Sequence, residues 1–99
     1  MKIKFEWDQA KAVSNLKKHG LSFDTAVRVF ADPFALAQQD RVENGEQRWQ
    51  TIGLVEGYLL VLVAHTVRDD EDGTEVIRII SARRAELKER KNYEQNSSL

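Results

Sequence analysis

The hydrophobic pattern changes its period along the chain, and this change is the strongest constraint on the fold. In the first third, Phe23, Ala26, Val27 and Phe30 recur at i, i+3, i+4 and i+7, the spacing that puts apolar side chains on one face of a helix. Later, β-branched and aromatic residues concentrate between turn signals, which predicts strands near 35–40, 48–56, 58–68 and 75–82. The sequence therefore predicts an α+β fold in which helices precede a meander of antiparallel strands.

The N-terminal elements follow from alternation and from capping residues. Residues 2–7 alternate between apolar and charged side chains, which predicts a short, half-buried strand. Asp8 is a suitable N-cap for a helix through about Lys18, and Gly20 is placed to end that helix. Ser22 can cap the second helix, which we expect to stop at Asp32-Pro33.

Turn signals and polarity organise the rest of the chain. Glu56-Gly57 predicts a tight hairpin turn, because glycine tolerates the positive φ that such turns require. From Ala85 the pattern is helical and mostly polar. We expect residues 1–95 to form a single domain and residues 96–99 to be a frayed C-terminal tail.

Composition excludes several classes of protein. A length of 99 residues suits one domain, and no apolar run approaches the roughly 20 residues that a membrane-spanning helix needs. The N-terminus lacks the apolar stretch of a signal peptide, so the sequence predicts a soluble, cytoplasmic protein. The chain has no Cys and only two distant His residues, which argues against disulfides, thiol catalysis and a zinc site. We expect no metal or other cofactor.

Charge is balanced overall but segregated along the chain. The formal net charge is −1, whereas residues 1–23 and 76–99 each carry +3, residues 24–56 carry −3 and residues 57–75 carry −4. If the fold brings the two basic ends together, they form one positive patch that could bind phosphate. The alternative is a set of solvated faces with local ion pairs.

Two clusters in the first half of the chain contain candidate catalytic groups. Lys18 and His19 end the first predicted helix, where His19 can titrate near neutrality or serve only as a C-terminal cap. Glu46 and Arg48 are two residues apart, so in a strand they share a face and could combine a base with a phosphate clamp. The alternative for this second cluster is a cross-strand ion pair on a solvated face.

A third cluster surrounds the last predicted strand and the helix after it. Its candidates for binding phosphate or RNA are Arg78, Arg83, Arg84, Lys88 and Tyr93. Arginine presents a fork of donors suited to phosphate oxygens, and an aromatic ring can stack on an unpaired base. Arg78 interrupts an apolar run and is costly unless it is paired or faces water. The alternative for Lys88 and the neighbouring basic residues is a solvated helix face.

Other polar and aromatic residues are better explained by packing. We expect His65 to be a half-buried histidine with its hydrogen bonds satisfied, and Trp7 and Trp49 to belong to the core. No glycine-rich phosphate loop, paired-carboxylate metal motif or Ser/His/Asp signature is present in the sequence.

Several motifs along the chain together resemble those of one known family. These motifs are Phe5-x-Trp7-Asp8-x-x-Lys11-x-x-x-Asn15-x-x-Lys18-His19-Gly20-x-x-Phe23-x-x-Ala26, Asp32-Pro33, Gly45-Glu46-x-Arg48-x-x-x-Ile52-Gly53, His65-Thr66 and Arg78-Ile79-Ile80-Ser81-Ala82-Arg83. They resemble the BrnT toxins of bacterial type II toxin–antitoxin systems from Phe5 to about Tyr93, almost the whole chain. The resemblance implies a RelE-like fold, ribonuclease activity that halts translation, and neutralisation by BrnA, a ribbon-helix-helix antitoxin that binds promoter DNA together with the toxin.

One feature departs from what free RNA binding favours. The acidic turn Asp69–Asp72 and Glu75 make this chain less basic than an RNA-binding protein that acts alone. We therefore expect weak nonspecific RNA affinity that is concentrated on one face and sharply reduced by salt.

The combined expectation is a metal-independent endoribonuclease in which the 2′-hydroxyl attacks the neighbouring phosphodiester. This reaction needs a base, cationic donors for the phosphorane and an acid for the leaving oxygen. Arg48 and Arg83 are assigned to the phosphate with help from Lys18. His19 or Glu46 serves as base or acid, and Tyr93 stacks on a base or orients the phosphate.

Two alternatives to an RNA-cutting toxin are a catalytically inactive corepressor, which binds promoter DNA only within an antitoxin complex, and a purely structural interaction domain. An antitoxin dimer could also bring two toxins together by its own symmetry.

Overall fold

A computed structural model describes residues 2–97. In chain order, its elements are β1 (Ile3–Trp7), α1 (Gln9–His19), α2 (Phe23–Val27), the 3-10 helix η1 (Arg28–Ala31), β2 (Leu36–Glu43), β3 (Glu46–Val55), β4 (Leu59–Asp69), β5 (Glu75–Arg84) and α3 (Leu87–Ser97). The α+β class predicted from the sequence is confirmed. Because α3 continues to Ser97, the helix includes the first two residues of the expected tail, and residues 98–99 lie outside the described range.

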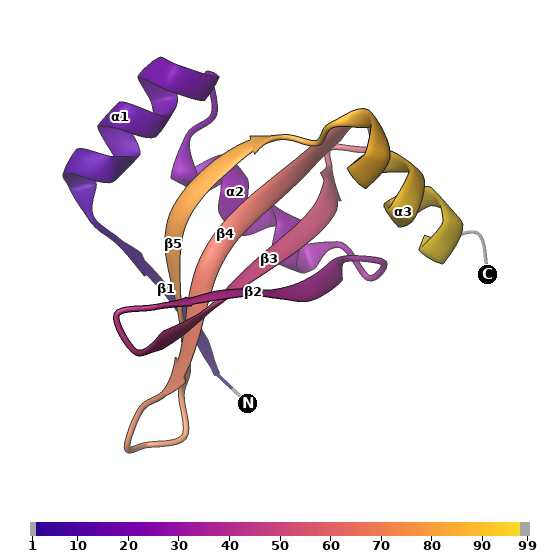
Figure 1. Cartoon of the computed structure of the whole chain (residues 1–99). Coiled ribbons are helices and arrows are strands. Elements are labelled where there is room, and N and C mark those ends of the chain that lie inside the picture. The colour runs from indigo at the N-terminus through magenta and orange to yellow at the C-terminus, as the bar shows by residue number, and fades with distance from the viewer. Residues whose placement is uncertain (1, 98–99) are drawn as a thin grey trace.

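The strands form one five-stranded sheet in the order β1-β5-β4-β3-β2 (Figure 1). Strands β2 to β5 are antiparallel neighbours, as the predicted meander requires. Strand β1 pairs in parallel with β5, and Ile3 to Trp7 lie opposite Glu75 to Ile79. The sheet is therefore mixed, and the N-terminal strand lies beside the last strand of the chain.

The helix boundaries follow the capping residues. The side chains of Asp8 and Ser22 accept hydrogen bonds from the backbone N–H groups of Lys11 and Thr25, both at 3.1 Å. Gly20 adopts φ of 70° at the end of α1, a left-handed conformation that favours glycine. The second helix is shorter than the predicted one, because the chain tightens into η1 after Val27.

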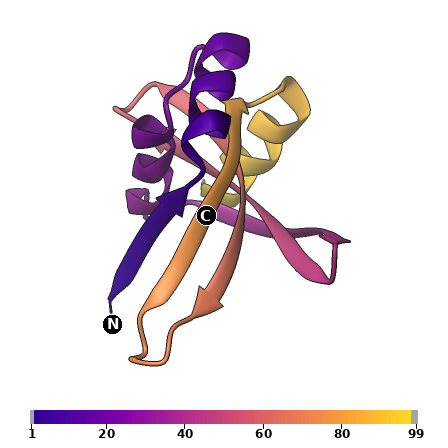
Figure 2. The same ribbon diagram turned by 90° about the vertical axis from the view of Figure 1, so that its left-hand side faces the viewer.

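The helices divide unequally between the two faces of the sheet. Helices α1, α2 and η1 cover one face, whereas α3 lies across part of the other (Figure 2). The main core lies on the first face and includes Phe23, Val29, Val61, Val63 and Ile79. A smaller cluster of Ile52, Leu60 and Tyr93 attaches α3 to the second face. The part of this second face that α3 leaves uncovered is called the open face below.

Asn15 attaches α1 to the exposed edge of β5. Strand β1 ends at Trp7, opposite Ile79, so the edge of β5 that faces β1 has no neighbouring strand beyond that point. The side chain of Asn15 is buried, donates to the carbonyl oxygen of Ala82 at 2.9 Å and accepts from the Ala82 N–H at 3.0 Å. A side-chain amide thus replaces the missing strand and fixes the end of α1 beside β5.

His65 lies in the core between the sheet and η1. It is 3% exposed, and its Nε2 lies 2.7 Å from the hydroxyl of Thr51. Its ring also packs edge-on against Phe30, with 5.0 Å between the ring centroids. Nδ1 is buried without a hydrogen-bond partner among the described residues. The predicted packing role is confirmed, although the ring is more deeply buried and less fully hydrogen-bonded than expected.

This burial predicts loss of stability in mild acid. Burial lowers the pKa of His65 from its ordinary value of 6.5, so below that pH the unfolded chain binds more protons than the folded protein. We expect the free energy of unfolding to be level above about pH 6.5 and to fall below it, by at most about 1.4 kcal/mol per pH unit. Urea unfolding at a series of pH values measures this slope.

The matched variants for this measurement are His65→Gln and His19→Gln. The first should flatten the pH dependence, whereas the second should keep it, because it leaves the buried His65 in place. Parallel curves for wild type and His65→Gln would contradict this explanation.

Candidate active site

Strand β5 presents three polar side chains to the open face. Arg83, Ser81 and Arg78 lie opposite Leu62, Ala64 and Thr66 of β4. Positions 78 and 81 differ by an odd number, so they would point to opposite faces of a regular strand. A bulge, at which Ala64 and His65 lie opposite Ser81 and Ile79, restores them to one face. The bulge is therefore what brings Arg78 and Arg83 onto the same surface.

Arg84 lies on the other side of the sheet. It is opposite Val61, a fully buried residue of the main core, and its own side chain is exposed at the end of β5. The structure therefore separates Arg84 from Arg83, although the two were grouped as candidate phosphate ligands.

Arg83 is held by Glu89 of α3. Its two terminal nitrogens donate to the two carboxylate oxygens of Glu89, both at 2.8 Å. Glu89 also accepts a hydrogen bond from the backbone N–H of Glu86 at 2.8 Å. The hydrogen bond from Arg83 lowers the pKa of Glu89, so the pair is ionised at neutral pH. Lys88 adjoins Glu89 and is exposed.

A second group of charges on the open face joins β3 to β5 across the intervening strand β4. Arg78 donates to Glu46 at 2.5 Å, and Arg48 forms an ion pair with Glu43 at 2.7 Å. Glu46 and Arg48 come from one strand, as predicted, but each pairs with a different residue. The Arg48 side chain is 19% exposed, and its Nε is buried without a hydrogen-bond partner among residues 2–97. This nitrogen is a donor that a ligand or water could satisfy.

Lys18 and His19 lie at the edge of β5. With Ile80 and Ser81 they help to line a cavity of about 180 Å³ that also borders Asn15. The amide of Asn15 holds α1 in this position. The structure thus places His19 beside Ile80 and Ser81 of β5, whereas Glu46 of β3 contacts Arg78 at another point of β5.

Tyr93 is buried rather than displayed. It is 7% exposed, and its hydroxyl donates to Asp32 at 2.5 Å. Burial and this contact with a carboxylate raise the pKa of Tyr93 to about 12. Burial also acts to raise the pKa of Asp32, but hydrogen bonds from Tyr93, Leu54 and Phe34 outweigh it and lower that pKa. These contacts give Tyr93 a structural role, and its participation in chemistry stays a prediction.

Sequence reasoning missed the acidic partners of the three arginines. Glu43 and Glu89 were not identified, and Glu46 was not matched with Arg78. The spacing of Glu86 and Glu89 at the start of a helix indicates a side chain that reaches back to a backbone N–H. Nothing in the spacing indicates the pairing with Arg83 across a strand–helix junction.

Within residues 2–97, no helix has the length and apolarity needed to cross a membrane. No group of three or more His, Asp or Glu side chains in this part of the chain lies close enough together to hold a metal ion.

The comparison with protein families identifies the class of protein. A family model described as "Ribonuclease toxin, BrnT, of type II toxin-antitoxin system" matches residues 7–89. The chain is thus a ribonuclease toxin of a type II toxin–antitoxin system, which implies an RNA substrate and an antitoxin partner. It belongs to the BrnT family.

A solved structure has the same fold. The crystal structure of the Brucella abortus ribonuclease toxin, BrnT, is 24% identical in sequence, with a TM-score of 0.60. The match covers 87% of this chain and 99% of the Brucella chain. No curated protein matches the sequence.

Tyr93→Phe tests whether the tyrosine is structural or catalytic. Removing the hydroxyl leaves a partly buried carboxylate without one of its donors, so we expect the free energy of unfolding to fall by about 1–3 kcal/mol. The folded variant should still cleave RNA. Urea unfolding and an RNA cleavage assay measure the two effects. A variant with wild-type stability and no cleavage would instead assign the hydroxyl to the reaction.

Proposed function

We propose that the protein is an endoribonuclease that cleaves mRNA in the cytoplasm and thereby inhibits translation. The 2′-hydroxyl oxygen attacks the adjacent phosphorus, and the bond from phosphorus to the 5′-oxygen breaks. A base takes the 2′-hydroxyl proton, and an acid gives a proton to the leaving 5′-oxygen. The products are a 2′,3′-cyclic phosphate and a 5′-hydroxyl.

The observation that carries this proposal is the placement of Arg48, Arg78 and Arg83 on the open face. Guanidinium groups stabilise the negative charge that develops on a phosphorane, and fixed donors do so without reorganising during the reaction. Lys18 at the β5 edge and Lys88 on α3 add positive charge around this surface. The RNA phosphates would therefore lie along β5 on the open face.

Each of these arginines already has a carboxylate partner. Glu43, Glu46 and Glu89 hold Arg48, Arg78 and Arg83, so phosphate must displace these oxygens or bind the remaining donors. The pairs keep the guanidinium groups oriented while cancelling their net charge. Competition between carboxylate and phosphate for the same guanidinium groups supports the expectation of weak RNA affinity. Each contact with phosphate is gained partly at the expense of an existing ion pair.

Glu46 and His19 are the two candidates for proton transfer. Glu46 lies against Arg78, and His19 lies beside Ser81. The two groups belong to different elements, α1 and β3, and both contact the neighbourhood of β5. Single-turnover cleavage by Glu46→Gln and His19→Gln tests both candidates, because loss of a general acid or base should slow the reaction by about 100- to 10,000-fold.

The proposed partner is a BrnA-like ribbon-helix-helix antitoxin, with promoter DNA contacted only through the antitoxin complex. An antitoxin dimer would bring two toxins together by its own symmetry. The mass of the complex made by co-expression, measured by light scattering, determines this ratio.

The ion pairs also favour a second candidate function. A face whose three arginines are all neutralised suits a corepressor that no longer cuts RNA but contributes to a DNA-bound complex. Such a protein would shift promoter DNA with antitoxin present and leave RNA intact.

The neighbouring arginines of β5 provide a sharp test of the proposed surface. Arg83→Ala should slow RNA cleavage by about 100- to 1,000-fold, the usual cost of removing one donor from a developing anionic charge. Arg84→Ala removes the same charge from the opposite face, and we expect cleavage close to the wild-type rate. Single-turnover cleavage of a labelled RNA measures both. Equal losses in the two variants would contradict a site confined to the open face.

A further inference from the structure

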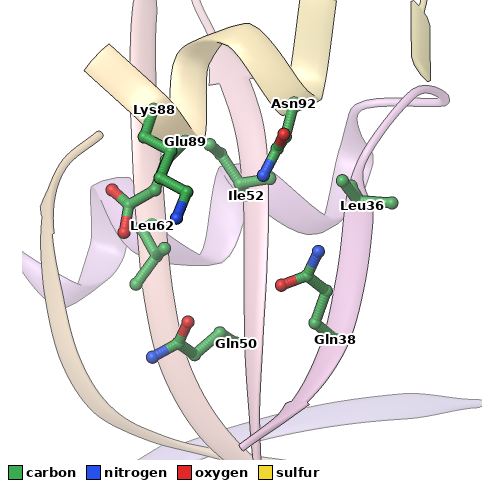
Figure 3. Close-up of a pocket in the computed structure, with 8 residues that line it drawn as sticks. All are labelled: Leu36, Gln38, Gln50, Ile52, Leu62, Lys88, Glu89 and Asn92. Atoms are coloured by element: carbon green, nitrogen blue, oxygen red, sulfur yellow. The ribbon is translucent and has the colours of Figure 1, made fainter. Parts of the chain in front are cut away.

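A cavity of about 200 Å³ lies between α3 and the open face, next to the Arg83–Glu89 pair. Figure 3 shows its lining, with Lys88 and Asn92 extending from α3 toward the sheet and the other side chains coming mainly from β2 and β3. The lining residues are Leu36, Gln38, Gln50, Ile52, Leu62, Lys88, Glu89 and Asn92. Of these, only Lys88 was singled out from the sequence as a candidate site residue.

The lining combines apolar and amide side chains. Ile52 and Leu62 are buried, and with Leu36 they provide aliphatic surface. The amides of Gln38 and Asn92 have no hydrogen-bond partner within residues 2–97. Gln50 donates to Asp40 at 3.3 Å, which leaves its amide oxygen available. The cavity therefore offers apolar contact together with free donors and acceptors.

The charges beside the cavity suit a nucleotide. Glu89 also lines it, but its carboxylate is occupied by Arg83 and by the N–H of Glu86. Lys88 stands exposed at the rim. A flat ring placed in the cavity would thus have a guanidinium and an ammonium close by for its phosphate.

We propose that this cavity holds one unpaired nucleobase of the RNA and that the amides of Gln38, Gln50 and Asn92 determine which base is preferred. The proposal rests on the ribonuclease function above and specifies how that site selects its substrate. Drug-sized ligands fill cavities of about 300–1,000 Å³, so the smaller volume here suits a single base. Single-stranded RNA is commonly recognised through hydrogen bonds to splayed bases, and amide side chains present both a donor and an acceptor.

Sequencing of cleavage ends tests the proposal on the full-length protein. A mixed RNA pool is cut by wild type, Gln38→Ala, Asn92→Ala and the control Gln39→Ala, and the base at each position around the cut is counted. Gln39 follows Gln38 but points to the opposite face of β2, where it faces away from the cavity. Because Gln38, Gln39 and Asn92 are exposed, the variants should fold as wild type does, which thermal unfolding checks.

We expect wild type and Gln39→Ala to share a base preference at one position. In Gln38→Ala and Asn92→Ala this preference should fall by about 3- to 10-fold, the range that one hydrogen bond supplies. The total rate of cleavage summed over all sites should change less than the preference does. An identical preference in all four proteins, or none in wild type, would overturn the proposal.

A binding measurement separates failure of this proposal from failure of the ribonuclease function. Adenosine, guanosine, cytidine and uridine 5′-monophosphates are titrated into the labelled protein, and the side-chain amide signals are followed by NMR. At least one nucleotide should shift the signals of Gln38 and Asn92 and leave that of Gln39 in place. Unmoved amide signals in a protein that cuts RNA contradict the nucleobase site alone. Shifted signals in a protein that never cuts RNA support the site and contradict the nuclease.

Discussion

The contact between Asn15 and Ala82 is the constraint on which the arrangement of the site depends. It joins residues 67 positions apart and closes the part of the β5 edge that β1 leaves without a partner. A buried amide that donates to and accepts from one backbone residue leaves little freedom for rotation or sliding of α1. The position of Lys18 and His19 beside β5 is a consequence, because both lie one turn after Asn15 on the same helix.

The unequal covering of the sheet explains where chemistry is possible. The larger core cluster lies on the face that α1, α2 and η1 cover, so stability does not require the opposite face to be apolar. That face can carry arginines, provided that each guanidinium is ion-paired or hydrated. Arg48, Arg78 and Arg83 each have a carboxylate partner. In the function we propose, phosphate exchanges for these carboxylates, so that a protein with a net charge of −1 can still bind RNA on this face.

Local sequence signals predict much of the fold, but they predict the arrangement of the site residues less well. Asp8, Ser22 and Gly20 act through neighbouring backbone groups, so their helix boundaries were predictable within a residue or two. The parallel pairing of β1 with β5 was not, because residues 3–7 carry no signal for a partner more than 70 positions away. The bulge that turns Arg78 onto the face of Arg83 is also invisible in the spacing, which by itself would place the two on opposite faces. The burial of Tyr93 depends on how α3 packs against the sheet, and the mostly polar sequence of α3 does not indicate that packing. The sequence therefore suggested an accessible ring that could stack on a base.

The central claim is that the side chains of this protein promote attack of the RNA's own 2′-hydroxyl on the neighbouring phosphate. The chemical groups at the ends of the cleaved RNA test this claim most directly. Purified protein is incubated with a synthetic RNA in the presence of EDTA, and the fragments are analysed by mass spectrometry. The account predicts cleavage that persists in EDTA and yields 2′,3′-cyclic phosphate and 5′-hydroxyl ends. Fragments with 3′-hydroxyl and 5′-phosphate ends, or cleavage that EDTA abolishes and magnesium restores, would contradict it.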